Sequence, residues 1–226
     1  MKKVIIVTGG CQGLGKEIAK FLGEENSLVI LSKDEAELKS VSCEIGCDNI
    51  PCDISDVSAV KSAVKFVTDK YGKIDALINN AGVWRGGELD DTEYEDIARL
   101  MLINAVGTMN MTKAVLPVMK KQKSGSIINI VSVDGLEGKE FRSVYGASKW
   151  AVTGFTESLR KELEKYNIFV TGIYPGLMKT NLFKNAGADR DFTNAMDPKD
   201  VAKAVQFVLT FENSCIEKIV IRGLHS

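Results

Sequence analysis

Short apolar runs alternate with longer amphipathic segments along almost the whole chain, and this alternation restricts the fold more than any other feature. Apolar runs predict strands at residues 3–8, 28–31, 49–51, 74–79, 126–131, 169–174 and 218–221. The amphipathic segments predict helices at residues 13–23, 33–43, 57–71, 92–121, 143–166 and 198–209. Continuously apolar strands are typical of a sheet that is covered on both faces. The sequence therefore predicts an α/β fold, a Rossmann-like doubly wound parallel sheet of about seven strands with helices on both faces.

Two helix starts and one helix break can be assigned from single residues. Asp56 and Asp197 are predicted N-caps, and the second precedes a proline at the first helical position. Residues 92–121 are long enough for two helices or one bent helix, with Gly107 as the candidate for the break.

Length and composition favour one soluble globular domain over residues 1–226. Charged residues make up 26% of the chain and the net charge is −1, so nothing indicates a nucleic-acid partner. The densest basic cluster favours a solvated helix end and consists of Lys120, Lys121 and Lys123. No apolar run reaches the ~18 residues of a membrane span, and the run at residues 4–7 is too short for a signal peptide. We therefore expect a cytoplasmic protein without a membrane partner.

A glycine-rich turn follows the first predicted strand and opens the first helix. Gly9, Gly13 and Gly15 have the spacing G-x-x-x-G-x-G, and the backbone NH groups of such a turn can face a pyrophosphate at a helix N-terminus. The spacing differs from the general dinucleotide fingerprint G-x-G-x-x-G. Glycines that serve only a tight strand-to-helix turn are the alternative.

The end of the second predicted strand bears on the choice of dinucleotide. A carboxylate there would bind an adenosine ribose, whereas a basic residue would accept a 2′-phosphate. The chain has Ser32, Lys33 and Asp34 at this place. Lys33 favours NADP(H) over NAD(H), and the neighbouring Asp34 keeps NAD(H) as the alternative.

Tyr145 and Lys149 have a spacing of four, which places them on one face of a helix. A fixed positive charge beside a phenol favours the phenolate and lowers the phenol pKa, so such a tyrosine can act as a general acid or base. An ordinary helix surface is the alternative for this pair taken alone.

The five cysteines are odd in number and irregularly spaced, so we expect free thiols: Cys11, Cys43, Cys47, Cys52 and Cys215. The second, third and fourth lie close together in the sequence. Their spacing does not suit zinc, and the only histidine is His225 near the end of the chain. We therefore predict no metal site, and small buried or half-buried cysteines are the favoured interpretation.

The glycine turn, the run Asn79 to Gly82, Ser132, and Tyr145 with Lys149 occur in one order along the chain. Tyr145 follows Ser132 by thirteen residues. Together these motifs resemble the short-chain dehydrogenase/reductase family in its small single-domain branch, with similarity to 3-oxoacyl-carrier-protein reductase-like members. The resemblance covers about residues 4–221. It implies an oxidoreductase that transfers a hydride between NAD(P)(H) and a carbonyl or secondary alcohol, with NADPH-dependent reduction of a small ketone or aldehyde as the expected direction.

The resemblance also implies a role for each matching residue. The catalytic set is Asn104, Ser132, Tyr145 and Lys149: Tyr145 is the general acid/base, Ser132 holds the substrate oxygen, Lys149 binds the nicotinamide ribose and lowers the tyrosine pKa, and Asn104 supports a proton path to the lysine. The expected cofactor contacts, Tyr145 and Lys149 included, are otherwise Gly9, Gly13, Leu14, Lys33, Asp53, Asn80, Ala81, Gly82, Pro175, Gly176 and Thr180. An N-cap is the alternative role for Asp53.

The chain departs from the family pattern at two places. Gln12 stands where many NADP-preferring relatives have a basic residue, and the substrate loop at residues 177–197 is shorter than in many relatives.

Relatives commonly pair the segments 92–121 and 143–166 across subunits, so a homodimer or homotetramer is expected. A catalytically idle dinucleotide-binding redox sensor is the alternative function, and the chain is too short for the nucleotide-sugar branch. Residues proposed to line the substrate pocket are Trp84, Arg85, Leu136, Phe141, Met178 and Phe183, and ordinary packing is the alternative for each.

Overall fold

Seven parallel strands form a single sheet in the computed structural model, which describes residues 2–224. The strands are β1 (Val4–Thr8), β2 (Ser27–Ser32), β3 (Asp48–Pro51), β4 (Ala76–Asn79), β5 (Gly125–Ile130), β6 (Ile168–Pro175) and β7 (Lys218–Ile221). Their order in the sheet is β3-β2-β1-β4-β5-β6-β7. The chain reverses its direction of winding between β1 and β4, and ligand crevices of doubly wound sheets lie at such a point.

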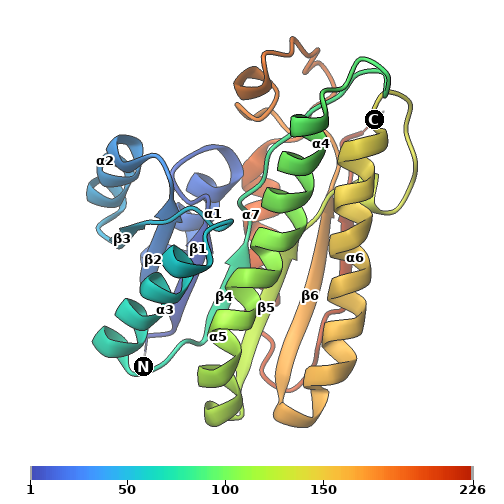
Figure 1. Cartoon of the computed structure of the whole chain (residues 1–226). Coiled ribbons are helices and arrows are strands. Elements are labelled where there is room, and N and C mark those ends of the chain that lie inside the picture. Colours follow the sequence, from blue (N-terminus) through green and yellow to red (C-terminus); the bar gives the residue numbers. More distant parts are fainter. Residues whose placement is uncertain (1, 225–226) are drawn as a thin grey trace.

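Helices cover both faces of the sheet and make three layers (Figure 1). One layer consists of α1 (Gly13–Gly23), α2 (Glu35–Ile45) and α7 (Pro198–Val208), and the other contains α3 (Val57–Tyr71), α4 (Tyr94–Leu100), α5 (Thr108–Gln122) and α6 (Ser143–Leu163). Each layer encloses its own apolar cluster against the sheet. Successive residues of β1 alternate between the two clusters, with Ile5 and Val7 in one and Val4 and Ile6 in the other, so every residue of β1 is buried. The predicted α/β fold is therefore confirmed.

The predicted N-caps are also confirmed. The Asp56 carboxylate accepts hydrogen bonds from two backbone NH groups of α3, and the Asp197 carboxylate accepts one from Lys199 at the start of α7. Several of the predicted helix ends need correction. Helix α2 begins at Glu35 rather than residue 33, because Asp34 caps it and leaves Lys33 in the preceding loop. It also ends later than predicted, at Ile45 rather than residue 43. Helix α4 begins at Tyr94 rather than residue 92. Helix α6 ends at Leu163 and continues as the 3-10 turn η3 (Glu164–Tyr166).

The long segment after β4 is one continuous helical stretch with a wide central turn. Between α4 and α5 lies the π-helix η1 (Met101–Gly107), and Gly107 keeps helical backbone angles (φ −59°, ψ −42°). Gly107 therefore does not interrupt the helical stretch, which continues directly into α5. A Cβ atom at this position would lie 2.6 Å from the side chain of Ile54, so the glycine permits close packing of the helix on the loop after β3.

The C-terminal half of α5 carries the predicted basic helix end, where Lys120 and Lys121 occupy the last turn. Short 3-10 turns, η2 (Val133–Gly135) and η4 (Lys184–Ala186), lie in the loops after β5 and β6. None of the helices in residues 2–224 combines the length and apolar character that a bilayer crossing requires.

Candidate active site

A cavity of about 650 Å³ opens along the carboxyl ends of β1, β2, β4, β5 and β6. All the residues predicted to contact a cofactor line this one cavity, and so do Ser132, Tyr145 and Lys149. The predicted set comes from seven separate stretches of the sequence, so only the sheet topology brings its members together. Asn104 is the exception, because it does not line the cavity.

The glycine turn forms a cradle that side chains larger than hydrogen would fill. Gly9 and Gly13 have φ values of +63° and +48°, which favour glycine. A Cβ atom on Gly9 would lie 3.0 Å from the Cα of Ala81, and one on Gly15 would lie 2.0 Å from the Gly9 carbonyl oxygen. Asn80 fixes the turn, because its Nδ2 donates hydrogen bonds to the carbonyl oxygens of Thr8 (2.9 Å) and Gly9 (3.2 Å).

The N-terminus of α1, directly after this turn, has no side-chain cap and no acidic residue in its first turn. Its first NH groups and the positive end of the helix dipole therefore remain suited to an anionic group. The backbone at Gly9 and Gly13, together with this helix end, fits the pyrophosphate of a dinucleotide.

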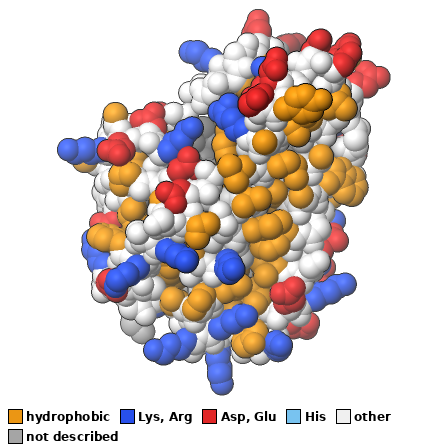
Figure 2. All heavy atoms as spheres, in the orientation of Figure 1, with side chains coloured by type: hydrophobic (Ala, Val, Ile, Leu, Met, Phe, Trp, Pro, Cys, Tyr) orange, Lys and Arg blue, Asp and Glu red, His pale blue; other side chains and the backbone are white. Residues whose placement is uncertain are grey.

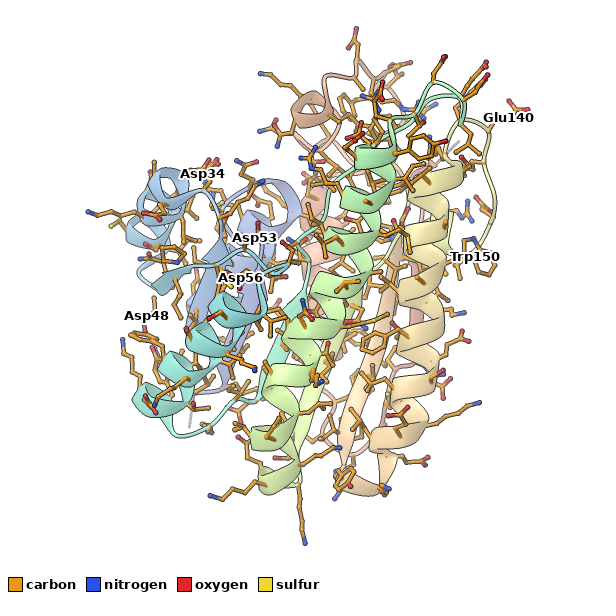
Figure 3. All side chains as sticks on the ribbon, in the orientation of Figure 1. Asp34, Asp48, Asp53, Asp56, Glu140 and Trp150 are labelled. Carbon is orange, nitrogen blue, oxygen red and sulfur yellow. The ribbon has the colours of Figure 1, made fainter. Side chains whose placement is uncertain are left out.

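The far end of the cavity is lined by Ser32, Lys33, Asp34 and Asp53. Figure 3 shows Asp34 and Asp53 at this side of the molecule. The Asp34 carboxylate accepts a hydrogen bond from the NH of Glu37 (3.1 Å), and its own NH donates to the Ser32 hydroxyl (3.3 Å). Asp34 thus serves as a helix cap, whereas Lys33 is exposed and forms no ion pair with any carboxylate in residues 2–224.

Asp53 is not the N-cap of α3, since that role belongs to Asp56. One carboxylate oxygen of Asp53 accepts hydrogen bonds from the NH (2.9 Å) and hydroxyl (2.6 Å) of Ser55. These hydrogen bonds lower the pKa of the Asp53 carboxyl, and the positive charge of Lys33 adds to the effect. An ionised carboxylate therefore faces the cavity beside Lys33.

Gln12, which stands where many NADP-preferring relatives have a basic residue, is hydrogen-bonded to other side chains of the protein. Its amide nitrogen donates to the Glu37 carboxylate, and its amide oxygen accepts a hydrogen bond from Asn185 (3.0 Å). Gln12 therefore links the glycine turn to the loop that follows β6.

Ser132, Tyr145 and Lys149 meet at the middle of the cavity. Ser132 follows β5, and its hydroxyl oxygen accepts a hydrogen bond from the NH of Asp134 (3.1 Å). Tyr145 and Lys149 lie one turn apart on α6, both only 6% exposed, with the ammonium 5.7 Å from the centre of the phenol ring. The Lys149 ammonium donates to the carbonyl oxygen of Ile130 (3.3 Å). The pair is therefore part of a buried wall of the cavity, not an ordinary helix surface.

Burial dominates the protonation of this pair. It raises the pKa of the Tyr145 phenol above its ordinary value, and the negative charge of Asp134 raises it further. The Ser132 hydroxyl and the Arg142 guanidinium lower that pKa, but by less. Burial also lowers the pKa of Lys149 to about 8. The loss of water around the phenol therefore outweighs the positive charge of Arg142, and the lowering of the Tyr145 pKa by Lys149 stays a prediction.

Asn104 lies in the π-helix η1 behind the cavity wall and is 1% exposed. Its side chain holds the backbone of Val83 at both ends: Oδ1 accepts from the Val83 NH (2.8 Å) and Nδ2 donates to the Val83 carbonyl (2.9 Å). Nδ2 also donates to the Ser148 hydroxyl (3.0 Å). Asn104 thus joins the loop after β4 to α6, one residue before Lys149.

One ion pair near Ser132 and Tyr145 was not predicted from the sequence, and it consists of Asp134 and Arg142. Asp134, two residues after Ser132, is 2% exposed and accepts a hydrogen bond from Arg142 at 2.8 Å. Arg142 immediately precedes α6 and lies three residues before Tyr145. The proximity of both residues to the recognised motifs is the only signal in the sequence, because their pairing depends on the fold.

The proposed substrate-lining residues divide into three groups. Trp84, Met178 and Phe183 line the main cavity, where the Trp84 and Phe183 rings pack edge to face at 4.9 Å. Phe141 lines a neighbouring cavity. Leu136 packs in an apolar cluster instead, and Arg85 lies 3.5 Å from the Asp96 carboxylate; neither lines a cavity described here.

The five cysteines are free thiols. Burial raises the pKa of Cys47 and Cys52 to about 11 and also raises that of Cys11, so these thiols stay protonated at neutral pH. No group of three metal-ligating side chains occurs within residues 2–224, and His225 lies outside the described residues.

Comparison with known proteins identifies the family. A family model described as short chain dehydrogenase matches residues 3–191. Carbonyl reductase family member 4 from Xenopus tropicalis is 36% identical over 218 residues, which cover 92% of each chain. An uncharacterized oxidoreductase from Staphylococcus aureus is 32% identical over 212 residues, with 92% of this chain and 91% of that protein covered.

Two solved structures share the fold at higher coverage. Actinorhodin polyketide ketoreductase, in a variant solved with NADPH, has a TM-score of 0.90 and 27% identity over 98% of this chain and 96% of its own. The 3-ketoacyl-(acyl-carrier-protein) reductase from Brucella melitensis, complexed with NADH, has a TM-score of 0.91 and 26% identity over 98% and 97%. The family match, the cradle and the buried tyrosine agree: the chain belongs to the short chain dehydrogenase family and is an NAD(P)-dependent oxidoreductase acting on alcohol or carbonyl groups.

Proposed function

We propose that this protein reduces a small ketone or aldehyde with NADPH. The observation that carries the proposal is the position of Ser132, Tyr145 and Lys149 on the wall of the same cavity as the glycine cradle. A nicotinamide bound along this cavity would supply the hydride. The protein supplies position, polarity and a proton.

The two hydroxyls have different tasks in this proposal. Ser132 already accepts a hydrogen bond from the Asp134 NH, so its own O–H is available to donate to a substrate oxygen. Tyr145 is held protonated by burial and can donate its proton to the same oxygen as negative charge develops there. Lys149 would bind the nicotinamide ribose, and Asn104 positions the loop and helix around it. The residues Gly9, Gly13, Leu14, Asn80, Ala81, Gly82, Pro175, Gly176 and Thr180 keep their proposed cofactor contacts.

NADP(H) is favoured over NAD(H) because of the loop between β2 and α2. The Asp34 carboxylate, which would favour a free ribose, is engaged as a helix cap, whereas the Lys33 ammonium has no carboxylate partner in residues 2–224. A cation at this position suits a 2′-phosphate. Asp53 would contact the adenine.

The test is to titrate the purified protein with NADPH and NADH and then to assay a panel of ketones and aldehydes with the tighter cofactor. We expect NADPH to bind more tightly and to be oxidised by at least one carbonyl compound. Tighter NADH binding would contradict the assignment of Lys33, and tight cofactor binding without any turnover would revive the idle redox sensor. The reductase and oxidoreductase names of the relatives do not favour that alternative.

We also propose a homodimer or homotetramer of single-domain subunits, each comprising residues 1–226. Apolar side chains are exposed along η1 and α6, including Leu102 (45%), Val106 (40%) and Trp150 (49%). Figure 2 shows an apolar band over the α4, α5 and α6 layer. Contiguous apolar surface of this kind is typical of subunit contacts.

The free cysteines support a reducing compartment, so we propose a cytoplasmic location. Fluorescence microscopy of a tagged protein in its native cell tests this location.

A further inference from the structure

A second cavity of about 320 Å³ adjoins the substrate end of the main cavity. Trp84, Lys139, Arg142 and Arg190 line both cavities, so the two spaces share one wall. Lys139 and Arg142 come from the loop between β5 and α6, and Arg190 comes from the loop after β6. Three cations from two separate loops therefore converge beside the proposed catalytic centre.

The carboxylates near this wall form ion pairs with Arg142 and Lys139. Asp134 lies 2.8 Å from Arg142 and 3.5 Å from Lys139, and Glu137 lies 3.3 Å from Lys139. The remaining carboxylate, Glu140, is exposed and lines the second cavity beside the three cations, with no ion pair to any of them (Figure 3).

Arg190 differs from the other two cations. Its guanidinium lies 5.7 Å from the Phe183 ring, and no carboxylate in residues 2–224 is within ion-pair distance. Arg142 uses Nη1 for Asp134, which leaves its other N–H groups available. These donors have the planar geometry that suits a carboxylate or phosphate.

Trp84 lines the same wall and carries a neutral donor that is unpartnered within residues 2–224. This donor is its indole Nε1–H, which is buried. A buried donor without an acceptor is costly, and an acceptor atom of a bound ligand would remove that cost.

We propose that the second cavity is an anion subsite, which takes the carboxylate or phosphate group of a carbonyl substrate whose C=O lies against Ser132 and Tyr145. This inference rests on the proposed reductase function and narrows its substrate class to anionic ketones or aldehydes. Arg190 and Arg142 bind the anionic group, and Lys139 adds positive charge at the rim.

The test compares matched anionic and neutral aldehydes in NADPH-dependent reduction. The carboxylate pairs are 2-, 3- and 4-formylbenzoate, each against its methyl ester, and the phosphate pair is 4-formylphenyl phosphate against 4-methoxybenzaldehyde. We expect at least one anionic compound to have a kcat/KM about tenfold or more above its neutral partner, as hydrogen bonds to charged groups commonly provide. The pair that shows the effect distinguishes carboxylate from phosphate recognition.

The variant Arg190→Gln should remove most of that preference by lowering kcat/KM for the anionic compound far more than for the neutral one. Lys184→Gln is the matched control, because Lys184 lies in the same loop, is exposed and lines neither cavity. This control should keep the preference. Equal use of anionic and neutral partners in every pair, or equal effects of the two variants, would overturn the subsite while leaving the reductase function intact.

A binding measurement covers the case in which the wild-type protein reduces none of these aldehydes, a result that counts against the proposed function. In a Trp150→Phe background, Trp84 is the remaining tryptophan and lines the subsite. Benzoate should change its fluorescence saturably, benzamide should not, and Arg190→Gln should abolish the benzoate response. Identical responses to benzoate and benzamide would contradict the anion subsite.

Discussion

Burial and charge at a few residues decide the chemistry of this site. Tyr145 and Lys149 are almost fully buried, which raises the pKa of the phenol and lowers that of the ammonium to about 8. Asp134 and Arg142 then act on Tyr145 in opposite directions, because one is negative and the other positive. The protonated phenol is the form that donates a proton to a carbonyl oxygen during reduction.

Replacing Tyr145 by Phe removes the proposed acid while keeping the ring. We expect kcat for carbonyl reduction to fall by about 10²- to 10⁴-fold, the usual contribution of a positioned acid. Fluorescence titration should show NADPH binding largely unchanged, since the cradle lies on other elements. Near-normal turnover in this variant would end the assignment.

Replacing Asp134 by Asn should shift the pH dependence of catalysis to lower pH. Asp134 raises the pKa of Tyr145, so removing its charge lowers that pKa. Reduction needs the protonated phenol and will decline at a lower pH than in the wild type, and alcohol oxidation needs the phenolate and will begin at a lower pH. Rate profiles of both directions, extended to the highest pH at which circular dichroism shows the fold intact, measure the shift.

Arg142→Gln is the control for that experiment, because it breaks the same 2.8 Å contact from the other side. Arg142 lowers the pKa of Tyr145, so its loss should move both profiles to higher pH. Shifts in the same direction for the two variants would mean that the pair acts only on the local structure.

At the scale of elements, the start of α2 determines which residues belong to the loop between β2 and α2. The periodicity of the sequence predicts helix from residue 33, but the Asp34 cap delays the start to Glu35. Lys33 therefore projects from a loop that lines the cavity, and the Asp34 carboxylate is committed to the helix. Helix propensity does not show whether Asp34 is the N-cap or a residue of the first turn. Aspartate is favourable at both positions.

Lys33→Ala should weaken NADPH binding by about fivefold or more, which corresponds to the loss of one charge contact with a phosphate at a partly exposed site. The dissociation constant for NADH should change little, since NADH has no 2′-phosphate. Lys39→Ala on the exposed side of α2 is the matched control. Equal weakening of both cofactors would show that Lys33 does not read the 2′-phosphate.

The helical stretch after β4 shows how packing can override a local signal. Gly107 is the candidate for a break, yet it keeps helical backbone angles, and Ile54 packs where a side chain at this position would otherwise be. The wide π turn places Asn104 against Val83 and Ser148. The position of Asn104 in the sequence is enough to identify it as a candidate. Only the contacts with Val83 and Ser148 show that it connects the loop after β4 to α6.

At the scale of the whole molecule, the apolar band on η1 and α6 bears on assembly. Trp150 projects outward from α6 (Figure 3), is 49% exposed and does not line the main cavity. The double variant Leu102→Glu and Trp150→Glu places charges within this band, and we expect it to shift the protein from an oligomer toward a single chain. Size-exclusion chromatography with light scattering measures the mass.

Phe66→Glu is the control for assembly, because Phe66 is equally exposed (46%) but lies on α3. It should leave the mass unchanged. A wild-type protein that is already a single chain at micromolar concentration would contradict the proposed assembly.

The sequence by itself determined the order of strands and helices, the glycine turn and the spacing of Ser132, Tyr145 and Lys149, because these follow from local periodicity and from motifs along one chain. Tertiary structure alone decided what surrounds them. Asp134 meets Arg142, Arg190 reaches the wall shared with Trp84, and burial raises the pKa of Tyr145 against the influence of nearby positive charge. Desolvation and charge pairing depend on distances between residues far apart in the chain, and those distances exist only once the sheet has assembled.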